Sequence, residues 1–271
     1  MALMPTPAPS SVSEAVAKPL RSLLSAPATP ASLNRALRHL AKWRAELVAN
    51  TLIQRSGGVV LSGPFQGMLY EVRAAEGSRA ARLIGAYEAS LHPVIEEIVA
   101  RVPDLVIDIG SAEGYYAVGL ARRLPGARVL ARDASGKAQD MCQTLAAANG
   151  VADRVEVGGL WSHADFAVCA KARAVVICDI EGAEEALLDP VAAPGLIHAD
   201  ILVECHPGMS PGETERLAAR FAPTHRLRQI GRKLDDSGLP GWMENLSDLD
   251  RLLALWEWRA APTPWLWMEK R

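Results

Sequence analysis

Two carboxylates stand at the end of an apolar run, in the stretch AVVICDIEGAEEALL over residues 174–188. The run has the β-branched and apolar composition of a buried strand, which by itself has no use for the charges of Asp179 and Glu181. Two interpretations compete. Asp179 would cap the following helix, with Glu181 in its first turn where the helix dipole favours an acid. Alternatively, both carboxylates face a ligand at the end of the strand.

A second polar turn follows an earlier apolar run, in LVIDIGSAEGYYAVGLARRL over residues 105–124. The strand ends near Asp108, turns at Gly110 and enters a helix after Gly114. In an open parallel sheet, ligands bind at the carboxyl ends of strands, and a glycine there lets the backbone approach a ligand closely. The next expected strand ends at Asp133, about 25 residues later, which is close to the spacing of an acid that binds a ribose diol.

Three interpretations of this turn are open. A dinucleotide site favours G-x-G-x-x-G, whereas the chain has D-x-G-x-x-x-G. A purely structural turn leaves Asp108 and Asp133 without an explanation. S-adenosylmethionine (SAM) carries an ammonium group and a ribose but no pyrophosphate, so it needs acids and not a phosphate cradle. The residues favour SAM, with Asp133 on the ribose hydroxyls and Asp108 near the ammonium end through water or backbone.

The apolar runs alternate with helical patterns in the middle of the chain. This alternation predicts an α/β fold with a doubly wound, mostly parallel sheet that is covered by helices on both faces. Trp256 and Trp258 alternate, as do Trp265 and Trp267, which predicts two late strands joined by a proline-containing turn. The expected central strands are 104–109, 127–132, 154–157, 174–179 and 200–205.

Four blocks in a fixed order carry a family resemblance: DIGSAEG, RDAS, DIEGAE and LVECHP. They resemble the class I SAM-dependent methyltransferases, and most closely the FkbM-type O-methyltransferases, over roughly residues 60 to 210. In that family the fourth strand ends in Asp-x-Glu-Gly-Ala-Glu and the fifth in Glu-x-His. The resemblance implies a Rossmann-like sheet of seven strands, the last one antiparallel, with the late tryptophan-rich segments as its edge hairpin.

Two departures from the family pattern concern the adenosine end of the cofactor. The second strand ends in Arg132 before Asp133, where many relatives have an aromatic or apolar residue. The third strand ends in VGGLWS, without the acid that often faces the adenine amino group, so Leu160 and Trp161 are expected there instead.

The resemblance also implies a site. Asp179 and Glu181 lie at the end of the fourth strand, facing the transferable methyl group, and Glu204 and His206 end the fifth strand. His206 is the expected general base, because the pKa of a histidine starts near neutrality. A Mg or Mn ion held by these four residues is the alternative, ranked second. The expected cofactor contacts are Tyr87, Glu88, Asp108, Gly110, Ser111, Glu113, Gly114, Tyr115, Asp133, Ala134, Leu160, Trp161 and Asp179.

The function expected from these residues is SAM-dependent methylation of a hydroxyl group on a small molecule. The alternatives are an N- or carboxyl-methyltransferase, a catalytically silent SAM-binding or interaction protein, and an NAD-dependent oxidoreductase. The 29 basic and 31 acidic residues give a net charge of −2, which argues against nucleic acid as a partner. The four cysteines form no CxxC pair, and no apolar run has the length of a membrane span or a secretory signal, so a cytoplasmic protein is expected.

The N-terminal part predicts three segments. Residues 1–30 are rich in Pro, Ala and Ser and are expected to be a flexible tail, residues 31–85 a helix and hairpin cap, and residues 86–271 the SAM-binding domain. The cap helix has Ser32 as a candidate N-cap and Gly57 as its stop. It is expected to be a lid or the contact of a homodimer. Its apolar stripe is Leu33, Leu37, Leu40 and Leu47, and its basic residues, expected on a solvated face, are Arg35, Arg38, Lys42 and Arg44.

Overall fold

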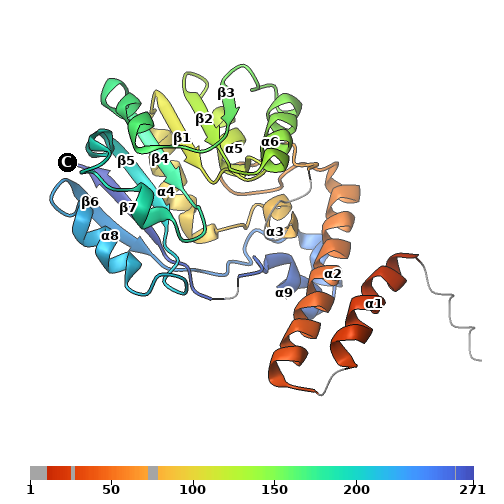
Figure 1. Ribbon diagram of the computed structural model, residues 1–271. Coiled ribbons are helices and arrows are strands. Elements are labelled where there is room, and N and C mark those ends of the chain that lie inside the picture. The colour runs from red at the N-terminus through yellow and green to blue at the C-terminus, as the bar shows by residue number, and fades with distance from the viewer. Residues whose placement is uncertain (1–10, 26–27, 73–78, 260) are drawn as a thin grey trace, which may run out of the picture.

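The computed structural model describes residues 11–25, 28–72, 79–259 and 261–271. A seven-stranded sheet in the order β3-β2-β1-β4-β5-β7-β6 forms its centre (Figure 1). The first five strands run parallel, and β7 is antiparallel to both β5 and β6. The strands are β1 (Leu105–Ile109), β2 (Arg128–Arg132), β3 (Val155–Gly158), β4 (Ala174–Cys178), β5 (Ala199–Glu204), β6 (His225–Ile230) and β7 (Trp265–Lys270).

The register of the central strands fixes what meets at their carboxyl ends. Ile109 of β1 lies opposite Arg132 of β2 and Cys178 of β4. The next positions, Gly110, Asp133 and Asp179, therefore emerge side by side where the strand order reverses around β1. This is the place where open α/β sheets bind ligands.

Helices cover both faces of the sheet, as the residue pattern predicted. On one face the apolar side chains of the strands pack against α4 (His92–Arg101), α5 (Tyr115–Arg123) and α6 (Gly136–Ala148). The other face packs against α7 (Glu184–Leu187), α8 (Glu213–Phe221) and the short 3-10 helices η2 (His163–Lys171) and η3 (Pro194–His198). Two apolar layers thus sandwich a sheet whose central strands β1 and β4 are buried on both sides.

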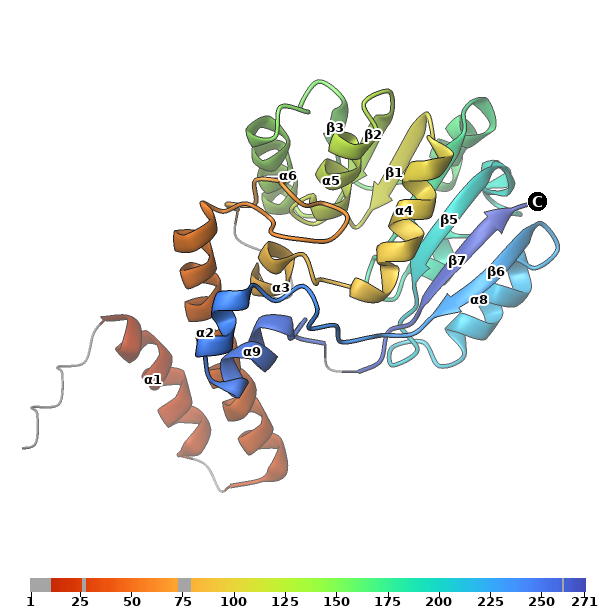
Figure 2. The same ribbon diagram turned by 180° about the vertical axis from the view of Figure 1, so that it is seen from behind.

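A group of helices lies beyond the carboxyl ends of the parallel strands (Figures 1 and 2). The long helix α2 (Pro30–Ser56) packs against α1 (Ser11–Leu24), α3 (Arg79–Ile84) and α9 (Asp248–Leu255). The remaining 3-10 helices are η1 (Ala89–Leu91) and η4 (Gly241–Asn245). None of the helices in the described part of the chain is long and apolar enough to cross a membrane.

The central strands agree with the sequence prediction to within one residue at either end, but the late hairpin was wrong. Trp256 and Trp258 lie in an irregular segment after α9, and β7 pairs instead with β6, over residues 225–230. That strand was missed because it is an edge strand with mostly half-exposed or exposed side chains, so HRLRQI carries no apolar run.

The N-terminal expectations need three corrections. A helix, α1, occupies Ser11–Leu24 within the expected flexible tail, and residues 1–10 lie outside the described residues. Helix α2 ends at Gly57 as predicted, with φ 64°, but its N-cap is Thr29, and Ser32 supplies the second half of a capping box. Of the expected hairpin, the described residues show one antiparallel bridge, between Val59 and Leu69.

The third correction concerns the faces of α2. Its buried side chains are those of Ser32, Ala36, Ala45, Val48, Ala49 and Leu52, whereas Leu33 and Leu37 of the expected stripe are 51% and 65% exposed. The basic residues are not a simple solvated face either. Arg44 makes two hydrogen bonds to Asp250, and Lys42 lies 4.4 Å from the ring centre of Trp258. The buried face of α2 is the one that carries the alanines, because their small side chains let α2 pack closely against α3 and α9. The face that carries the leucines stays more exposed.

Candidate functional site

Two adjoining cavities lie at the carboxyl ends of β1, β2 and β4. Their volumes are about 650 Å³ and about 510 Å³, each within the usual range for a small-molecule site. Both are lined by Gly110, Asp133, Ala134 and Ile180, so they meet along one wall. The wall is made of the turns that follow the three strands.

Gly110 allows these turns to touch. Its φ is 81°, and a Cβ atom built on it would lie 1.6 Å from the carbonyl oxygen of Asp179. Only glycine fits that position, because any side chain would separate the turn after β1 from the turn after β4. The floor between the two cavities is therefore bare backbone.

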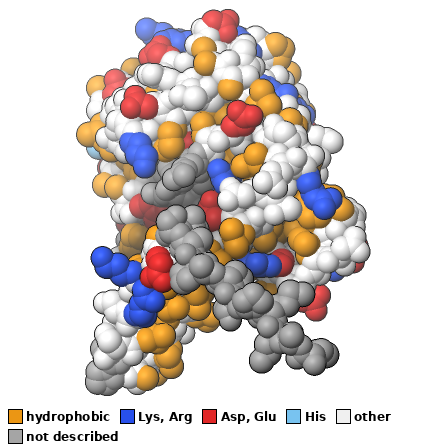
Figure 3. All heavy atoms as spheres, turned by 90° about the vertical axis from the view of Figure 1, so that its right-hand side faces the viewer, with side chains coloured by type: hydrophobic (Ala, Val, Ile, Leu, Met, Phe, Trp, Pro, Cys, Tyr) orange, Lys and Arg blue, Asp and Glu red, His pale blue; other side chains and the backbone are white. Residues whose placement is uncertain are grey.

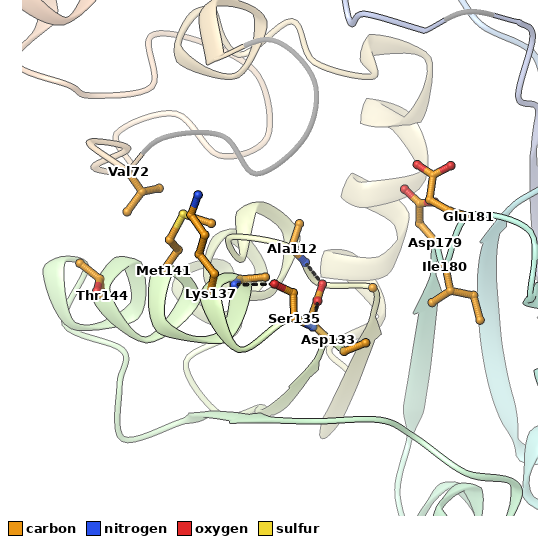
Figure 4. Close-up of a pocket in the computed structure, with 13 residues that line it drawn as sticks. Val72, Ala112, Asp133, Ser135, Lys137, Met141, Thr144, Asp179, Ile180 and Glu181 are labelled. Atoms are coloured by element: carbon orange, nitrogen blue, oxygen red, sulfur yellow. Dashed lines mark hydrogen bonds between the residues drawn. The ribbon is translucent and has the colours of Figure 1, made fainter.

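Asp133 is held at the common wall by two backbone donors. The amide of Ala112 donates to Oδ2 at 2.9 Å, and the amide of Ser135 donates to Oδ1 at 2.8 Å (Figure 4). A carboxylate oxygen has two lone pairs, so each oxygen keeps capacity to accept a further hydrogen bond. The carboxylate is thus fixed in direction and still able to bind a pair of hydroxyl groups.

The smaller cavity is mainly apolar. Leu160, Trp161, Ala183 and Leu187 line it, and the guanidinium of Arg132 lies 5.3 Å from the ring centre of Trp161. Arg132, which departs from the family pattern at the end of β2, therefore stacks on Trp161, which departs from that pattern after β3. Together they form a flat wall that suits a planar, weakly polar ring.

The larger cavity ends at the carboxylates of Asp179 and Glu181, which point the same way from the end of β4 (Figure 4). Behind them lies His206, only 4% exposed, with Nε2 3.6 Å from Asp179 Oδ1 and 3.4 Å from Glu181 Oε2. Glu204 is also near, with its Oε2 3.6 Å from the same nitrogen. The sequence-predicted group of two carboxylates, Glu204 and His206 is therefore brought together; we call these four residues the acid–imidazole cluster.

Glu184 organises this cluster, and sequence reasoning missed it. Its Oε1 lies 2.9 Å from His206 Nδ1, and its two oxygens accept the amides of Ile180 and Gly182 at 2.9 and 2.8 Å. The chain carries it in the run GAEEALL, where nothing in the sequence distinguishes the fully buried Glu184 from its partly exposed neighbour Glu185. Glu184 thus fixes both the turn that bears Glu181 and the orientation of the imidazole.

The helix-cap interpretation of the two carboxylates does not fit this geometry. Helix α7 begins at Glu184 after Ala183, and no side chain of the described residues caps it. Glu181 has φ 56°, a backbone conformation that non-glycine residues rarely adopt and that is common near functional sites. The carboxylates of Asp179 and Glu181 face the cavity and the imidazole instead.

Charge crowding shifts the titration of the cluster. Burial, together with the nearby Glu204 carboxylate, raises the pKa of Asp179 well above its ordinary value. Burial lowers the pKa of His206, but the carboxylates of Glu184, Glu204 and Glu181 outweigh it and raise that pKa above the ordinary value. The imidazole therefore favours its protonated form more than an isolated histidine would.

A buried arginine holds Glu204 from the other side. Arg259 forms ion pairs with Glu204 and Glu88 and lies 3.0 Å from Glu257, and Thr263 donates to Glu204 at 2.7 Å. Sequence reasoning missed Arg259, because it is a single basic residue far along the chain from its partners. The C-terminal segment is thereby tied to the end of β5.

Of the expected cofactor residues, some line the two cavities and others do not. Those that do are Gly110, Asp133, Ala134, Leu160, Trp161 and Asp179. Within the described part of the chain, those found elsewhere are Tyr87, Glu88, Asp108, Ser111, Glu113, Gly114 and Tyr115.

Two of these residues, Glu88 and Glu113, have other partners. Glu88 is buried, accepts from Tyr116 and pairs with Arg259, and burial raises its pKa to about 8. Glu113 is fully buried, accepts from the Tyr70 hydroxyl at 2.5 Å and lies 3.2 Å from Arg82, so it anchors the N-terminal segment to the start of α5. The expected roles of Glu88 and Glu113 in cofactor binding are replaced by these structural ones.

Comparison with known proteins gives similarities at low identity. No protein-family model matches the chain. A release factor glutamine methyltransferase of Chlorobaculum tepidum is 46% identical over 50 residues, which span 18% of this chain and 17% of that protein. The chain therefore matches less than a fifth of this relative's length.

Several solved structures are similar in arrangement. An O-methyltransferase from Bacillus cereus, in complex with SAH, has a TM-score of 0.48 at 12% identity and covers 95% of this chain and 97% of that one. The O-methyltransferase TomG from Streptomyces achromogenes, involved in tomaymycin synthesis and in complex with SAM, has a TM-score of 0.46 at 15% identity, over 68% and 81% of the two chains. A tRNA methyltransferase of B. subtilis has a TM-score of 0.43 at 9% identity, over 65% and 64%. Similarities at this level leave the activity to be argued from the site itself.

Proposed function

We propose that the protein is a SAM-dependent methyltransferase that methylates a hydroxyl group of a small molecule. The observation that carries this proposal is the common wall of the two cavities. There, Asp133 with free acceptor capacity lies beside the bare backbone of Gly110, and Asp179 and Glu181 close the far end.

The residues fit the parts of SAM. The apolar cavity with Trp161 and Leu187 suits the adenine ring, Asp133 suits the two ribose hydroxyls, and the Gly110 backbone permits close approach. Bound SAM would supply a methyl group on a positively charged sulfur. An NAD site fits less well, because the Ala112 amide is taken by Asp133 and the Gly114 amide by the Ser111 carbonyl. These amides are therefore not directed at a pyrophosphate.

The acceptor would lie in the larger cavity, against Asp179 and Glu181. A hydroxyl group must lose its proton as it gains a methyl group, and the acid–imidazole cluster is the nearest set of groups that can accept or stabilise that proton. The protein's further task is to align the acceptor and to keep water away.

Calorimetry tests the cofactor. The wild type should bind SAM and SAH but not NAD. Asp133→Ala should weaken SAH binding by about 1–3 kcal/mol, roughly 5- to 150-fold, which is the scale of hydrogen bonds to a charged group. Asp140→Ala is the matched control, because Asp140 is an exposed acid on α6 outside both cavities. Wild-type affinity in Asp133→Ala would mean that the cofactor site lies elsewhere.

A methyl-transfer assay against a pool of small hydroxylated metabolites tests the reaction. Turnover in His206→Ala should fall by roughly two to four powers of ten, while SAH affinity stays near that of the wild type. Binding of SAH without any methylated product would point to a silent binder. A product methylated on nitrogen would overturn the hydroxyl assignment and keep the cofactor.

A further inference from the structure

We propose that Asp179, Glu181 and His206, with Glu204 as a further oxygen donor, hold a divalent metal ion at the end of the larger cavity. The ion's use in catalysis rests on the proposed function, whereas the site itself rests on the geometry. Three carboxylate oxygens from three different residues surround one imidazole nitrogen at 3.4–3.6 Å. One ligand atom each from Asp179, Glu181 and His206 lies within 4.8 Å of the others.

These distances are too long for hydrogen bonds and suitable for ligands of one ion. Ordinary N–H···O bonds span about 2.7–3.2 Å. An octahedral ion with metal–oxygen distances of about 2.1 Å places neighbouring ligands about 3 Å apart and opposite ligands about 4 Å apart. The contacts of His206 Nε2 fall between these two values, so small side-chain shifts would bring the atoms onto an ion.

The buried members of the cluster have unused ligand atoms. The His206 side chain is 4% exposed, and its Nε2 lies 3.4–3.6 Å from three carboxylate oxygens, beyond the usual length of a hydrogen bond. Asp179 Oδ1 is also buried and has no hydrogen-bond partner among the described residues. Burying such atoms without a partner is costly, and a cation placed between them would satisfy both at once.

The surrounding residues hold the imidazole as they would hold a metal ligand. His206 Nδ1 lies 2.9 Å from Glu184 Oε1, so a proton on Nδ1 would face that carboxylate and leave the lone pair on Nε2 for the ion. Glu204 is turned in the same way. Its Oε1 is engaged by Arg259 and Thr263, so Oε2 is the oxygen that faces Nε2.

The donor set indicates the kind of ion. Carboxylates suit Mg²⁺ and Mn²⁺, and an imidazole among them favours Mn²⁺ over Mg²⁺. Glu181, with a side chain 53% exposed, leaves the site open on the cavity side, where an acceptor hydroxyl could reach the ion. A cation there would lower the pKa of that hydroxyl directly. In the competing arrangement, no ion is bound and a protonated His206 balances the carboxylates.

Titration with Mn²⁺ alone distinguishes these arrangements. The free Mn²⁺ signal in electron paramagnetic resonance, measured with the full chain and no SAM, should fall with a stoichiometry of one ion per chain. Asp179→Asn and Glu181→Gln should each weaken Mn²⁺ binding at least tenfold. Glu185→Gln is the matched control, because Glu185 lies on α7, just after the turn that bears Glu181, but pairs with Arg216, and the Mn²⁺ affinity of this variant should equal that of the wild type.

The outcomes separate this inference from the proposed function. If the wild type binds no Mn²⁺ at millimolar concentration, or if Glu181→Gln binds it as well as Glu185→Gln does, the metal site is refuted and the protonated imidazole stands. SAH binding in the presence of EDTA is measured separately by calorimetry, and its failure would refute the SAM assignment while leaving a measured Mn²⁺ site intact. If both hold, EDTA should abolish methyl transfer and added Mn²⁺ should restore it.

Discussion

Asp108 lies at the end of β1, as predicted, but its side chain is buried and does not face the cavities where the cofactor was expected. It was expected near the ammonium end of SAM, yet its side chain is 3% exposed, Oδ2 has no partner among the described residues, and it lines neither cavity. Burial raises the pKa of Asp108 to about 7. The sequence could place an acid at the end of β1, but the direction of the side chain depends on packing beneath α5.

Asp108→Asn should therefore stabilise the protein in a pH-dependent way. The folded-state pKa of about 7 lies above the ordinary value of about 3.9. Ionising the buried acid costs stability, and this cost is absent below the ordinary pKa, grows between the two values and is complete above pH 7. Thermal unfolding should show a larger gain in melting temperature for Asp108→Asn at pH 8 than at pH 5.

Two outcomes for Asp108→Asn would contradict this prediction. A gain that is equal at the two pH values would mean that Asp108 is not a buried acid with a raised pKa. A loss of SAH affinity in Asp108→Asn, measured by calorimetry, would restore the role in cofactor binding that the sequence indicates.

At the scale of elements, the sequence predicted what local pattern controls and missed what distant packing controls. The strands β1, β2, β4 and β5 are buried on both faces or nearly so, and their continuous apolar runs made them visible. The edge strand β6 alternates with polar residues and was not seen. For α2, the prediction of a helix from periodicity was correct. Which face of α2 is buried depends on the close contact of its small residues with α3 and α9, and this contact cannot be predicted from periodicity.

The leucines of α2 remain as an exposed stripe. Leu33, Leu37 and Leu40 are 51%, 65% and 38% exposed. Apolar side chains gather on the helical region at the lower end of the molecule (Figure 3). Stripes of this kind on a surface helix mark interaction sites more often than isolated leucines do. We therefore propose that two copies of the chain associate through this face of α2.

Leu37→Asp should break such a dimer without unfolding the chain. The aspartate would place a charge in the centre of the apolar contact, whereas in the monomer the side chain is already mostly exposed. Light scattering should report a dimer mass for the wild type and a monomer mass for Leu37→Asp at the same concentration. Asn34→Asp, an exposed position on the same helix, is the control for added charge. A monomer mass for the wild type would refute the dimer.

At the scale of the whole molecule, a buried ionic network joins the helical group to the sheet. Arg259 follows Trp258, whose carbonyl oxygen accepts a hydrogen bond from Arg38 of α2 and whose ring lies against Lys42 of the same helix. Arg259 itself pairs with Glu204 at the end of β5. It also pairs with Glu88, which precedes the first strand, and with Glu257. Arg259 and these partners are separated by up to 171 residues, so no periodicity or spacing in the sequence could predict the pairs.

Arg259 is the cation shared by three buried carboxylates, and among the described residues Arg232 is a second cation, 3.9 Å from Glu257, so Glu88 and Glu204 depend most on Arg259. Arg259→Met keeps much of the side chain's volume, leaves Glu88 and Glu204 without this counter-ion, and leaves Glu257 with only the more distant Arg232. Removing one partner of a buried ionic group costs about 3–5 kcal/mol, because the remaining charges stay desolvated. Urea unfolding at pH 7.5 should show a loss of this size.

Two further measurements assign that loss to charge and not to packing. Adding Glu257→Gln to Arg259→Met removes one of the buried carboxylates that Arg259 paired with and should recover part of the lost stability. The difference in the free energy of unfolding between Arg259→Met and the wild type should also become smaller as the pH falls, because protonation removes the charge of the unpaired acids. Arg251→Met, which breaks an exposed pair with Glu244, should cost less than about 1 kcal/mol. A loss in Arg259→Met that is independent of pH and not relieved by Glu257→Gln would mean that Arg259 acts through its packing alone, and that the network does not hold the two halves of the molecule together by charge.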